Sequence, residues 1–268
     1  MSLRMLPSFL IVGGHRCGTT WLHYNLSTHP EVFMPRKTKE VHFFDKNYQK
    51  GIAWYEQYFR DAVRMTAGEC TPNYLYVPEA CQRIRSHIPH AKIIVCLRHP
   101  VERCFSFYLL LRANRNCQAS FEEQIERQPE IVREGYYLEY VQQYTRAFSR
   151  ENVLCLLFDD IVSEPLQVLH RVARFIGVDD GFRFPLAATR INSASSIKYL
   201  SRSRLLCNVG RALKKYRFYR TAFAVDHFNR KQLPDMAPAT RQRLLDTYRE
   251  KNRQLAAFLG ADLSAWER

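Results

Sequence analysis

Near its start the chain reads FLIVGGHRCGTTW over residues 9–21. The first four residues are apolar, as in a buried strand, and a pair of glycines follows them. After Gly18, two threonines open a stretch of helical spacing that continues to about residue 27 and stops near Pro30. A glycine-rich turn between a strand and a helix allows backbone N–H groups to surround a phosphate, and the helix N-terminus favours negative charge. This stretch therefore predicts a strand, a phosphate loop and a helix.

The glycine spacing of this loop fits the Walker A frame, but the lysine of that frame is missing. Gly13 and Gly18 have the required separation, Thr19 stands where the lysine belongs, and the basic side chain has moved back to Arg16. The hydroxyls of Thr19 and Thr20 lie at the start of the helix, where hydroxyls cap the backbone and bind oxygen ligands. We expect a phosphate loop of altered type; the alternative is an ordinary strand–turn–helix with a threonine cap.

Strand patterns alternate with helix patterns along most of the chain. We expect strands at residues 65–69, 92–97 and 153–158, and helices at residues 54–59, 79–87, 101–112, 136–148 and 164–176. From residue 192 the pattern is purely helical and basic, and a last helix covers residues 238–259. Such alternation predicts a P-loop-like α/β fold of three layers, with a mostly parallel central sheet flanked by helices. We expect one domain over residues 1–268, with an α/β nucleotide-binding core at 8–177 and a mainly helical, basic extension at 190–268.

Composition places the chain among ordinary globular proteins. It has 268 residues, of which 46% are hydrophobic and 25% charged. No apolar run approaches the roughly 18 residues of a membrane helix, and residues 1–7 do not resemble a signal peptide. The eight cysteines are scattered without a C-x-x-C pair, which argues against a zinc site or a disulfide framework. We therefore expect a soluble, cytoplasmic protein.

The charge balance indicates anionic partners. Forty basic and twenty-six acidic residues give a formal charge of +14. Residues 198–231 carry ten basic residues and a single acid, Asp226, interleaved with aromatic side chains. This segment fits a polyanion face, a membrane-surface helix or a docking site for an acidic carrier protein, while the alternative is a solvated basic face over an apolar stripe.

A second candidate anion site follows the strand at residues 92–97. In an open parallel sheet, ligands bind beyond the carboxyl ends of the strands, where Arg98 is expected to lie. Ser106 falls two helical turns later, on roughly the same side of the next helix. A guanidinium and a hydroxyl together suit a phosphate. The alternative is a structural ion pair of Arg98 and a solvated Ser106.

A third cluster, RKTKEVHFFD at residues 36–45, contains two candidate bases. Glu40 lies among three cations, which would keep its carboxyl group ionised. His42 is two residues away and titrates near neutral pH, so that it competes with Glu40 for the role of general base. Without further context, the cluster is a basic surface loop next to a buried pair of phenylalanines.

Taken together, these motifs resemble the sulfotransferase family. RCGTT, KEVHFFD, GECTPNY and LRHPVERCFSFY follow one another at residues 16–20, 39–45, 68–74 and 97–108, and GYY at residues 135–137 precedes a helix. The closest likeness is to the heparan sulfate and bacterial branch, which uses 3′-phosphoadenosine 5′-phosphosulfate (PAPS) as donor. The resemblance covers about residues 8–177 and implies a P-loop-like α/β fold.

The resemblance also implies roles for individual residues. It assigns donor binding to Arg16, Cys17, Gly18, Thr19, Thr20, Trp21 and Tyr137, with Arg98 and Ser106 on the 3′-phosphate, a pairing that excludes ATP. It implies that Glu40 is the base, with His42 as competitor and Arg16 stabilising the reaction. It places Lys39, Asp45, Thr71 and Tyr74 on the acceptor side. The glycine- and lysine-rich loop that often completes the 3′-phosphate site is missing beyond Gly177, where Arg190 or Lys198 would substitute.

The function implied is in-line transfer of a sulfuryl group from PAPS to a hydroxyl of a small-molecule, glycan or lipid acceptor. It would leave 3′-phosphoadenosine 5′-phosphate (PAP) and need no metal, because side chains supply the cations. We expect a cytoplasmic, bacterial enzyme, with membrane association through residues 198–231 as a variant and no nucleic-acid partner. One alternative is a small-molecule kinase using ATP and magnesium, in which Asp159 and Asp160 mimic a Walker B carboxylate. The other is a basic protein that binds polyanions or membranes without catalysis.

Overall fold

The computed structural model describes residues 5–35, 38–113, 119–189 and 235–268, and a few positions between 200 and 231. Its central sheet has five strands in the order β2-β3-β1-β4-β5, and all the pairs are parallel. The strands are β1 (Phe9–Gly13), β2 (Val32–Phe33), β3 (Thr66–Cys70), β4 (Lys92–Leu97) and β5 (Val153–Leu157). The expectation of a mostly parallel sheet is thus confirmed.

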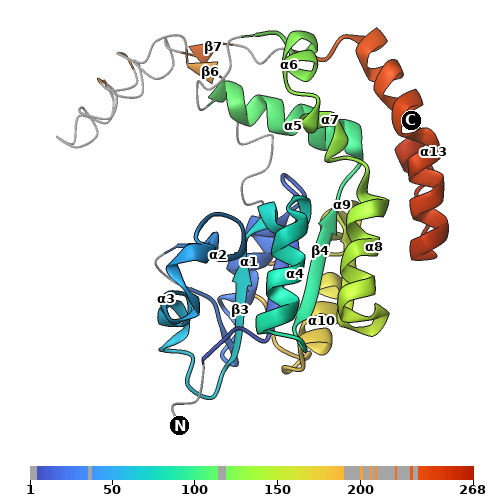
Figure 1. The fold of residues 1–268 in the computed structure, drawn as a ribbon. Helices are drawn as coiled ribbons and strands as arrows, with labels where there is room; N and C mark the ends of the chain where they lie inside the picture. The colour runs from blue at the N-terminus through green and yellow to red at the C-terminus, as the bar shows by residue number, and fades with distance from the viewer. Residues whose placement is uncertain are drawn as a thin grey trace.

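Helices cover both faces of this sheet and form three layers (Figure 1). They are α1 (Thr19–Leu26), α2 (Phe43–Lys46), α3 (Ile52–Glu56), α4 (Pro78–His87), α5 (Pro100–Ala113), α6 (Phe121–Arg127), α7 (Glu130–Arg133), α8 (Tyr137–Phe148), α9 (Phe158–Ser163), α10 (Pro165–Ile176) and α13 (Pro238–Leu259). The described residues also contain the 3₁₀ segments η1 (Tyr48–Lys50), η2 (Gln57–Phe59), η3 (Pro72–Tyr76), η4 (Arg150–Asn152) and η6 (Ser264–Glu267).

Alternation of side chains along the strands explains the layers. Leu10 and Ile93 pack on one face of the sheet with apolar residues of α4 and α8, whereas Ile11 and Ile94 pack on the other face with α1 and α10. All these side chains are fully buried, as expected for strands between two helical layers. A separate apolar cluster joins α5, α6 and α7 to α13, which runs beside α8 (Figure 1).

Several expected elements have the predicted bounds, and others differ. β4 and α13 coincide with residues 92–97 and 238–259. β5 ends at Leu157, one residue early, because Phe158 already begins α9. The sequence did not indicate β2, α2, α6, α7 or α9, and all of them but α6 have six residues or fewer. Such short elements lack a full hydrophobic period.

The expectation of a purely helical pattern from residue 192 is wrong at two places. β6 (Leu200–Ser201) pairs with β7 (Arg230–Lys231) in an antiparallel ladder. Backbone pairing across some thirty residues overrides a local helical pattern. Most of the basic segment 198–231, together with Arg190 and Lys198, lies outside the described residues. Within the described part of the chain, no helix combines the length and apolar character required to span a membrane.

Candidate active site

The parallel sheet brings the ends of β1, β3 and β4 to one edge, and the candidate residues follow these ends. The loop after β1 packs closely against Tyr76. A Cβ on Gly14 would lie only 2.7 Å from Tyr76 Oη, so a larger residue would not fit there. Gly18 then takes a left-handed conformation, with φ of 92°, and α1 begins at Thr19 without a side-chain cap. Uncapped N–H groups at a helix start are the usual partners of an anion.

The two anion sites expected from the sequence involve residues that lie in one cluster, namely Arg16, Arg98 and Ser106. Arg16 Nε donates to Ser106 Oγ at 3.0 Å, and Arg98 Nη1 donates to the backbone oxygen of Arg16 at 3.3 Å. Burial lowers the pKa of Arg16, and the nearby charge of Arg98 lowers it further. Neither guanidinium forms an ion pair with a carboxylate of the described residues. Two cations without a carboxylate between them suit a ligand that carries several negative charges.

The loop after β1 and α1 are held by three buried side chains, those of Cys17, Trp21 and Tyr137. The Tyr137 hydroxyl donates to the backbone oxygen of Arg98 at 2.8 Å and lies 3.9 Å from Cys17 Sγ. Trp21 Nε1 donates to the backbone oxygen of Ala187 at 3.1 Å. All three side chains are buried, and burial raises the pKa of the Cys17 thiol to about 11. Their contacts hold the loop and α1 in place.

An ionic network that the sequence did not indicate also fixes the loop after β1. His15 Nδ1 lies 3.2 Å from Glu134 Oε2, and the fully buried Arg103 donates to the same oxygen at 2.8 Å. The His15 ring also stacks on Phe107, with centroids 5.7 Å apart. Arg103 belongs to the LRHPVERCFSFY motif, which was the one available signal. Its partner follows 31 residues later, a separation that no spacing rule connects.

Glu40, His42 and Asp45 form a continuous chain of polar contacts. His42 Nε2 lies 3.3 Å from Glu40 Oε2, and His42 Nδ1 lies 2.8 Å from Asp45 Oδ2. Asn73 donates to the same oxygen of Asp45 at 2.6 Å, and Lys39 Nζ donates to Glu40 Oε1 at 2.9 Å. Glu40 is the most exposed of the three, and Asp45 is almost fully buried. The two candidate bases are therefore direct neighbours.

The pKa values of His42 and Glu40 are shifted in opposite directions. Hydrogen bonds first to Asp45 and then to Glu40 raise the pKa of His42 to about 9. Burial alone would raise the pKa of Glu40, but the hydrogen bond from His42 and the charge of Lys39 lower it to about 2. At neutral pH, His42 is a cation held between two carboxylates. An imidazolium has no free lone pair, so Glu40 is the group able to accept a proton.

Thr71 and Tyr74, which were expected on the acceptor side, lie under this chain of contacts. Both side chains are fully buried and donate to Glu69 Oε1, at 2.5 Å and 3.0 Å. The backbone N–H of His42 donates to Thr71 Oγ1 at 3.4 Å. Since Thr71 follows β3 and the phosphate loop follows the adjacent β1, the two candidate regions share one sheet edge.

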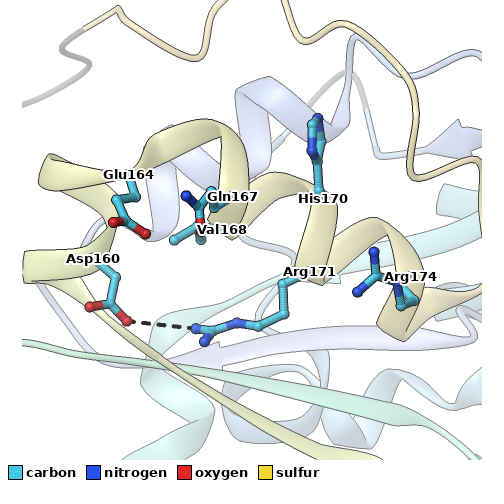
Figure 2. A pocket seen from close by; sticks show the side chains of 7 residues that line it. All are labelled: Asp160, Glu164, Gln167, Val168, His170, Arg171 and Arg174. Carbon is cyan, nitrogen blue, oxygen red and sulfur yellow. Dashed lines mark ion pairs between the residues drawn. The ribbon is translucent and has the colours of Figure 1, made fainter. Parts of the chain in front are cut away.

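Two acidic residues after β5 have other partners. Asp159 Oδ2 accepts a hydrogen bond from Trp266 Nε1 at 2.8 Å, and Asp160 pairs with Arg171 at 3.8 Å. A cavity of about 370 Å³ lies here (Figure 2), lined by Asp160, Glu164, Gln167, Val168, His170, Arg171 and Arg174. No residue of the phosphate loop lines it. Among the described residues, no group of three His, Cys, Asp or Glu side chains is arranged to hold a metal ion.

Fold and site together define a class: an α/β protein whose glycine-rich loop after β1 contains an arginine and lacks the Walker lysine. Comparison with known proteins is more specific. Residues 6–257 match the family model of the sulfotransferase domain. The chain belongs to the sulfotransferase family, which confirms the resemblance found in its motifs and leaves the kinase alternative without support.

Named relatives agree with this family. The chain is 31% identical to mouse bifunctional heparan sulfate N-deacetylase/N-sulfotransferase 4 over 206 residues, which cover 69% of this chain and 24% of the relative. It is 31% identical to mouse heparan sulfate glucosamine 3-O-sulfotransferase 3B1 over 185 residues, covering 65% of this chain and 47% of the relative. The chain thus spans about a quarter of the first relative and half of the second.

A solved structure matches nearly the whole chain. The sulfotransferase from Alicyclobacillus acidocaldarius superposes with a TM-score of 0.73 at 27% identity, over 98% of this chain and 99% of that one. This match extends past Gly177, where the resemblance found in the sequence ends, and so covers α13 as well.

Proposed function

We propose that this chain transfers the sulfuryl group of PAPS to a hydroxyl group of an acceptor, with Glu40 as general base. The observation that carries the proposal is the shared sheet edge. Arg16, Arg98 and Ser106 gather there without a carboxylate partner among the described residues, and the segment of Glu40 and His42 is tied to the same edge through Thr71. Family membership supports this reaction over other uses of a phosphate loop.

The side chains present fit the donor. Loop N–H groups, the start of α1 and Arg16 suit the 5′-phosphosulfate, while Arg98 and Ser106 suit the 3′-phosphate. When bound, PAPS supplies a sulfuryl group attached to a phosphate leaving group. Arg16 and the uncapped N–H groups at the start of α1 would stabilise the negative charge that grows on the leaving oxygen.

Glu40 is the base in this mechanism, and His42 is its positioning partner. At neutral pH the protonated His42 keeps Glu40 ionised and oriented, and Asp45 with Asn73 orients His42 in turn. Glu40 accepts the proton of the acceptor hydroxyl as the oxygen attacks. A carboxylate with a pKa of about 2 is a weak base at rest, but the hydroxyl becomes acidic as its oxygen bonds to sulfur.

For the acceptor we propose a saccharide hydroxyl, among the glycan, small-molecule and lipid classes that the motifs left open. The support comes from the relatives, whose names specify heparan sulfate and glucosamine. An amine acceptor is the variant that the N-sulfotransferase relative suggests. Binding of an acidic carrier protein or a membrane through residues 198–231, a cytoplasmic location and a bacterial source remain predictions.

A sulfuryl-transfer assay tests the proposal. The full chain is incubated with ³⁵S-labelled PAPS and panels of amino sugars, neutral sugars, small alcohols and lipid alcohols. Glu40→Gln should lower kcat by at least about 100-fold with PAP affinity unchanged, within the usual range for a general base. The control Glu139→Gln removes an exposed carboxylate that pairs with Lys251 and should retain activity. Transfer of phosphate from ATP, with no sulfuryl transfer to any acceptor, would contradict the proposal.

A further inference from the structure

Glu69 is a buried acid that the mechanism above does not use. It lies near the end of β3, its side chain is fully buried, and no lysine, arginine or histidine of the described residues pairs with it. Burial raises the pKa of Glu69 to about 7, even though hydrogen bonds from Thr71, Tyr55 and Tyr74 act in the opposite direction. A buried carboxyl group without a cation requires such donors.

Three hydroxyl groups surround this carboxyl group. Tyr55 donates to Oε2 at 2.7 Å, while Thr71 and Tyr74 donate to Oε1 at 2.5 Å and 3.0 Å. In its ionised form the carboxylate only accepts hydrogen bonds, so each hydroxyl then directs its single hydrogen toward Glu69. The lone pairs of Thr71 Oγ1 and Tyr74 Oη then face away from it and remain available as acceptors.

Backbone N–H groups of the segment between Glu40 and Asp45 use these lone pairs. The N–H of His42 donates to Thr71 Oγ1 at 3.4 Å, and the N–H groups of residues 43 and 44 donate to Tyr74 Oη at 2.8 Å and 3.3 Å. The N–H of residue 41 bonds to the Glu69 carboxylate itself. Four consecutive amides therefore depend on one buried carboxylate, directly or through one hydroxyl.

This segment needs such support. His42 has φ of 54°, in the left-handed region that residues other than glycine rarely adopt. A strained conformation persists only where surrounding contacts fix it. The same conformation places the His42 ring between Glu40 and Asp45, so any relaxation of the backbone would separate the three groups.

We propose that Glu69 is a positioning residue for sulfuryl transfer: through Thr71 and Tyr74 it holds the backbone that aligns Glu40, His42 and Asp45. The inference rests on the proposed function for its catalytic meaning, while its structural part stands on the contacts above. Because its side chain is fully buried, Glu69 offers no surface to a ligand and acts through its neighbours. It acts by fixing the direction of two hydroxyl hydrogens, and with them the acceptors of the loop amides.

Two substitutions and a matched control separate this role from general stability. Glu69→Gln keeps the shape but removes the negative charge and one of the two acceptor oxygens that serve three hydroxyls and the N–H of residue 41, so that the hydrogen bonds around it must rearrange. Tyr74→Phe removes the link to residues 43 and 44 and keeps Glu69 intact. Tyr55→Phe is the control, because it also deletes one buried hydrogen bond to Glu69, but on the oxygen that does not lead to the loop.

Kinetics give the first measurement. Glu69→Gln and Tyr74→Phe should lower kcat by about 10- to 100-fold, the range expected when catalytic groups shift by a fraction of an ångström to one ångström. The KM for PAPS and the Kd for PAP should stay within about twofold, because Arg16, Arg98 and Ser106 are untouched. Tyr55→Phe should retain kcat within about threefold. Equal losses in all three variants, or losses that follow only the folded fraction, would overturn the proposal.

Histidine-ring NMR gives the second measurement, which does not depend on turnover. In the unsubstituted chain the pKa of His42 is expected at about 9. The pKa of His42 should fall by about one unit or more toward its ordinary value in folded Tyr74→Phe and Glu69→Gln. In Tyr55→Phe it should keep the value of the unsubstituted chain. An unchanged His42 pKa in all variants overturns the proposal. If the unsubstituted chain transfers no sulfuryl group, the proposed function fails alone, and this titration still decides whether Glu69 aligns the loop.

Discussion

Arg16 shows how positive charge gathers around the glycine-rich loop after β1, which lacks the Walker lysine. Its guanidinium hydrogen-bonds to Ser106 on α5, and its backbone oxygen accepts from Arg98 at the end of β4. The residues that two separate motifs assigned to anion binding therefore lie in a single cluster. Because guanidinium groups remain charged at every ordinary pH, this cluster attracts anions throughout the working range.

His42 provides a prediction of pH dependence. Its pKa is raised from 6.5 to about 9 in the folded chain, so its contribution to the free energy of unfolding is fully present below pH 6.5 and is lost as the pH rises through 9. Because partial exposure screens the charges, we expect this contribution of His42 to the free energy of unfolding to be about 1 kcal/mol. Urea unfolding of the unsubstituted chain and of His42→Asn at pH 6 and pH 10 measures it.

The control for this measurement is His90→Asn, since His90 is exposed. The stability difference between the unsubstituted chain and His42→Asn should shrink between the two pH values, whereas that of His90→Asn should stay constant. A difference for His42→Asn that grows with pH would show that the imidazolium is not stabilised by Glu40 and Asp45.

Among the elements, η6 has a larger role than its four residues suggest. Trp266 is buried there, its indole N–H donates to Asp159 in the first turn of α9, and its ring lies 6.1 Å from that of Tyr137. Tyr137 in turn donates to the backbone oxygen of Arg98. The segment after α13 thus supports the edge of the sheet at which the anion cluster lies.

Substitution of Trp266 tests this support. Trp266→Phe keeps a buried ring but leaves Asp159 without its donor, which should lower the free energy of unfolding by about 1–2 kcal/mol. Trp266→Ala should cost about 3–5 kcal/mol, as expected for a large buried aromatic residue. Urea denaturation measures both. Trp54→Phe, a substitution of a partly buried ring, serves as control, and a Trp266→Ala chain no less stable than Trp54→Phe would contradict this role of η6.

The elements also show what the sequence allows one to predict. β4 was predicted to the residue because a continuous apolar run bounded by polar residues has few other interpretations. α13 was equally clear, since Pro238 opens it and Gly260, with φ of 66°, ends it. α6 and α7 were missed because their apolar faces pack on α5 and α13, partners that only the tertiary structure supplies.

The candidate site, like the fold, was predictable from the sequence only in part. Glu40, His42 and Arg98 stand in motifs whose residue types indicate acid–base chemistry and anion binding. Their mutual contacts were not predictable, because Arg16 meets Ser106 across 90 residues of sequence and His15 meets Glu134 across 119. The sequence showed Glu69 only as a member of the GECTPNY motif, and its burial follows from the interior position of β3 between β2 and β1.

At the scale of the whole molecule, fold and charge act together. A parallel sheet directs the ends of β1, β3 and β4 to one edge, and a chain with a formal charge of +14 draws anionic ligands toward it. The match to a sulfotransferase structure over 98% of the chain shows that the helical part belongs to the same architecture. The central claim is that this edge binds a nucleotide with phosphates at both the 3′ and 5′ positions.

Calorimetric titration of the full chain with PAP, compared with ADP and with ATP plus magnesium, tests that claim most directly. We predict micromolar binding of PAP, at least tenfold weaker binding of the nucleotides without a 3′-phosphate, and a loss of about tenfold or more for PAP in Arg98→Ala. Arg171→Ala, which removes an exposed arginine of α10, should bind PAP like the unsubstituted chain. Tighter binding of ATP with magnesium than of PAP, or equal PAP affinity in Arg98→Ala, would contradict the account.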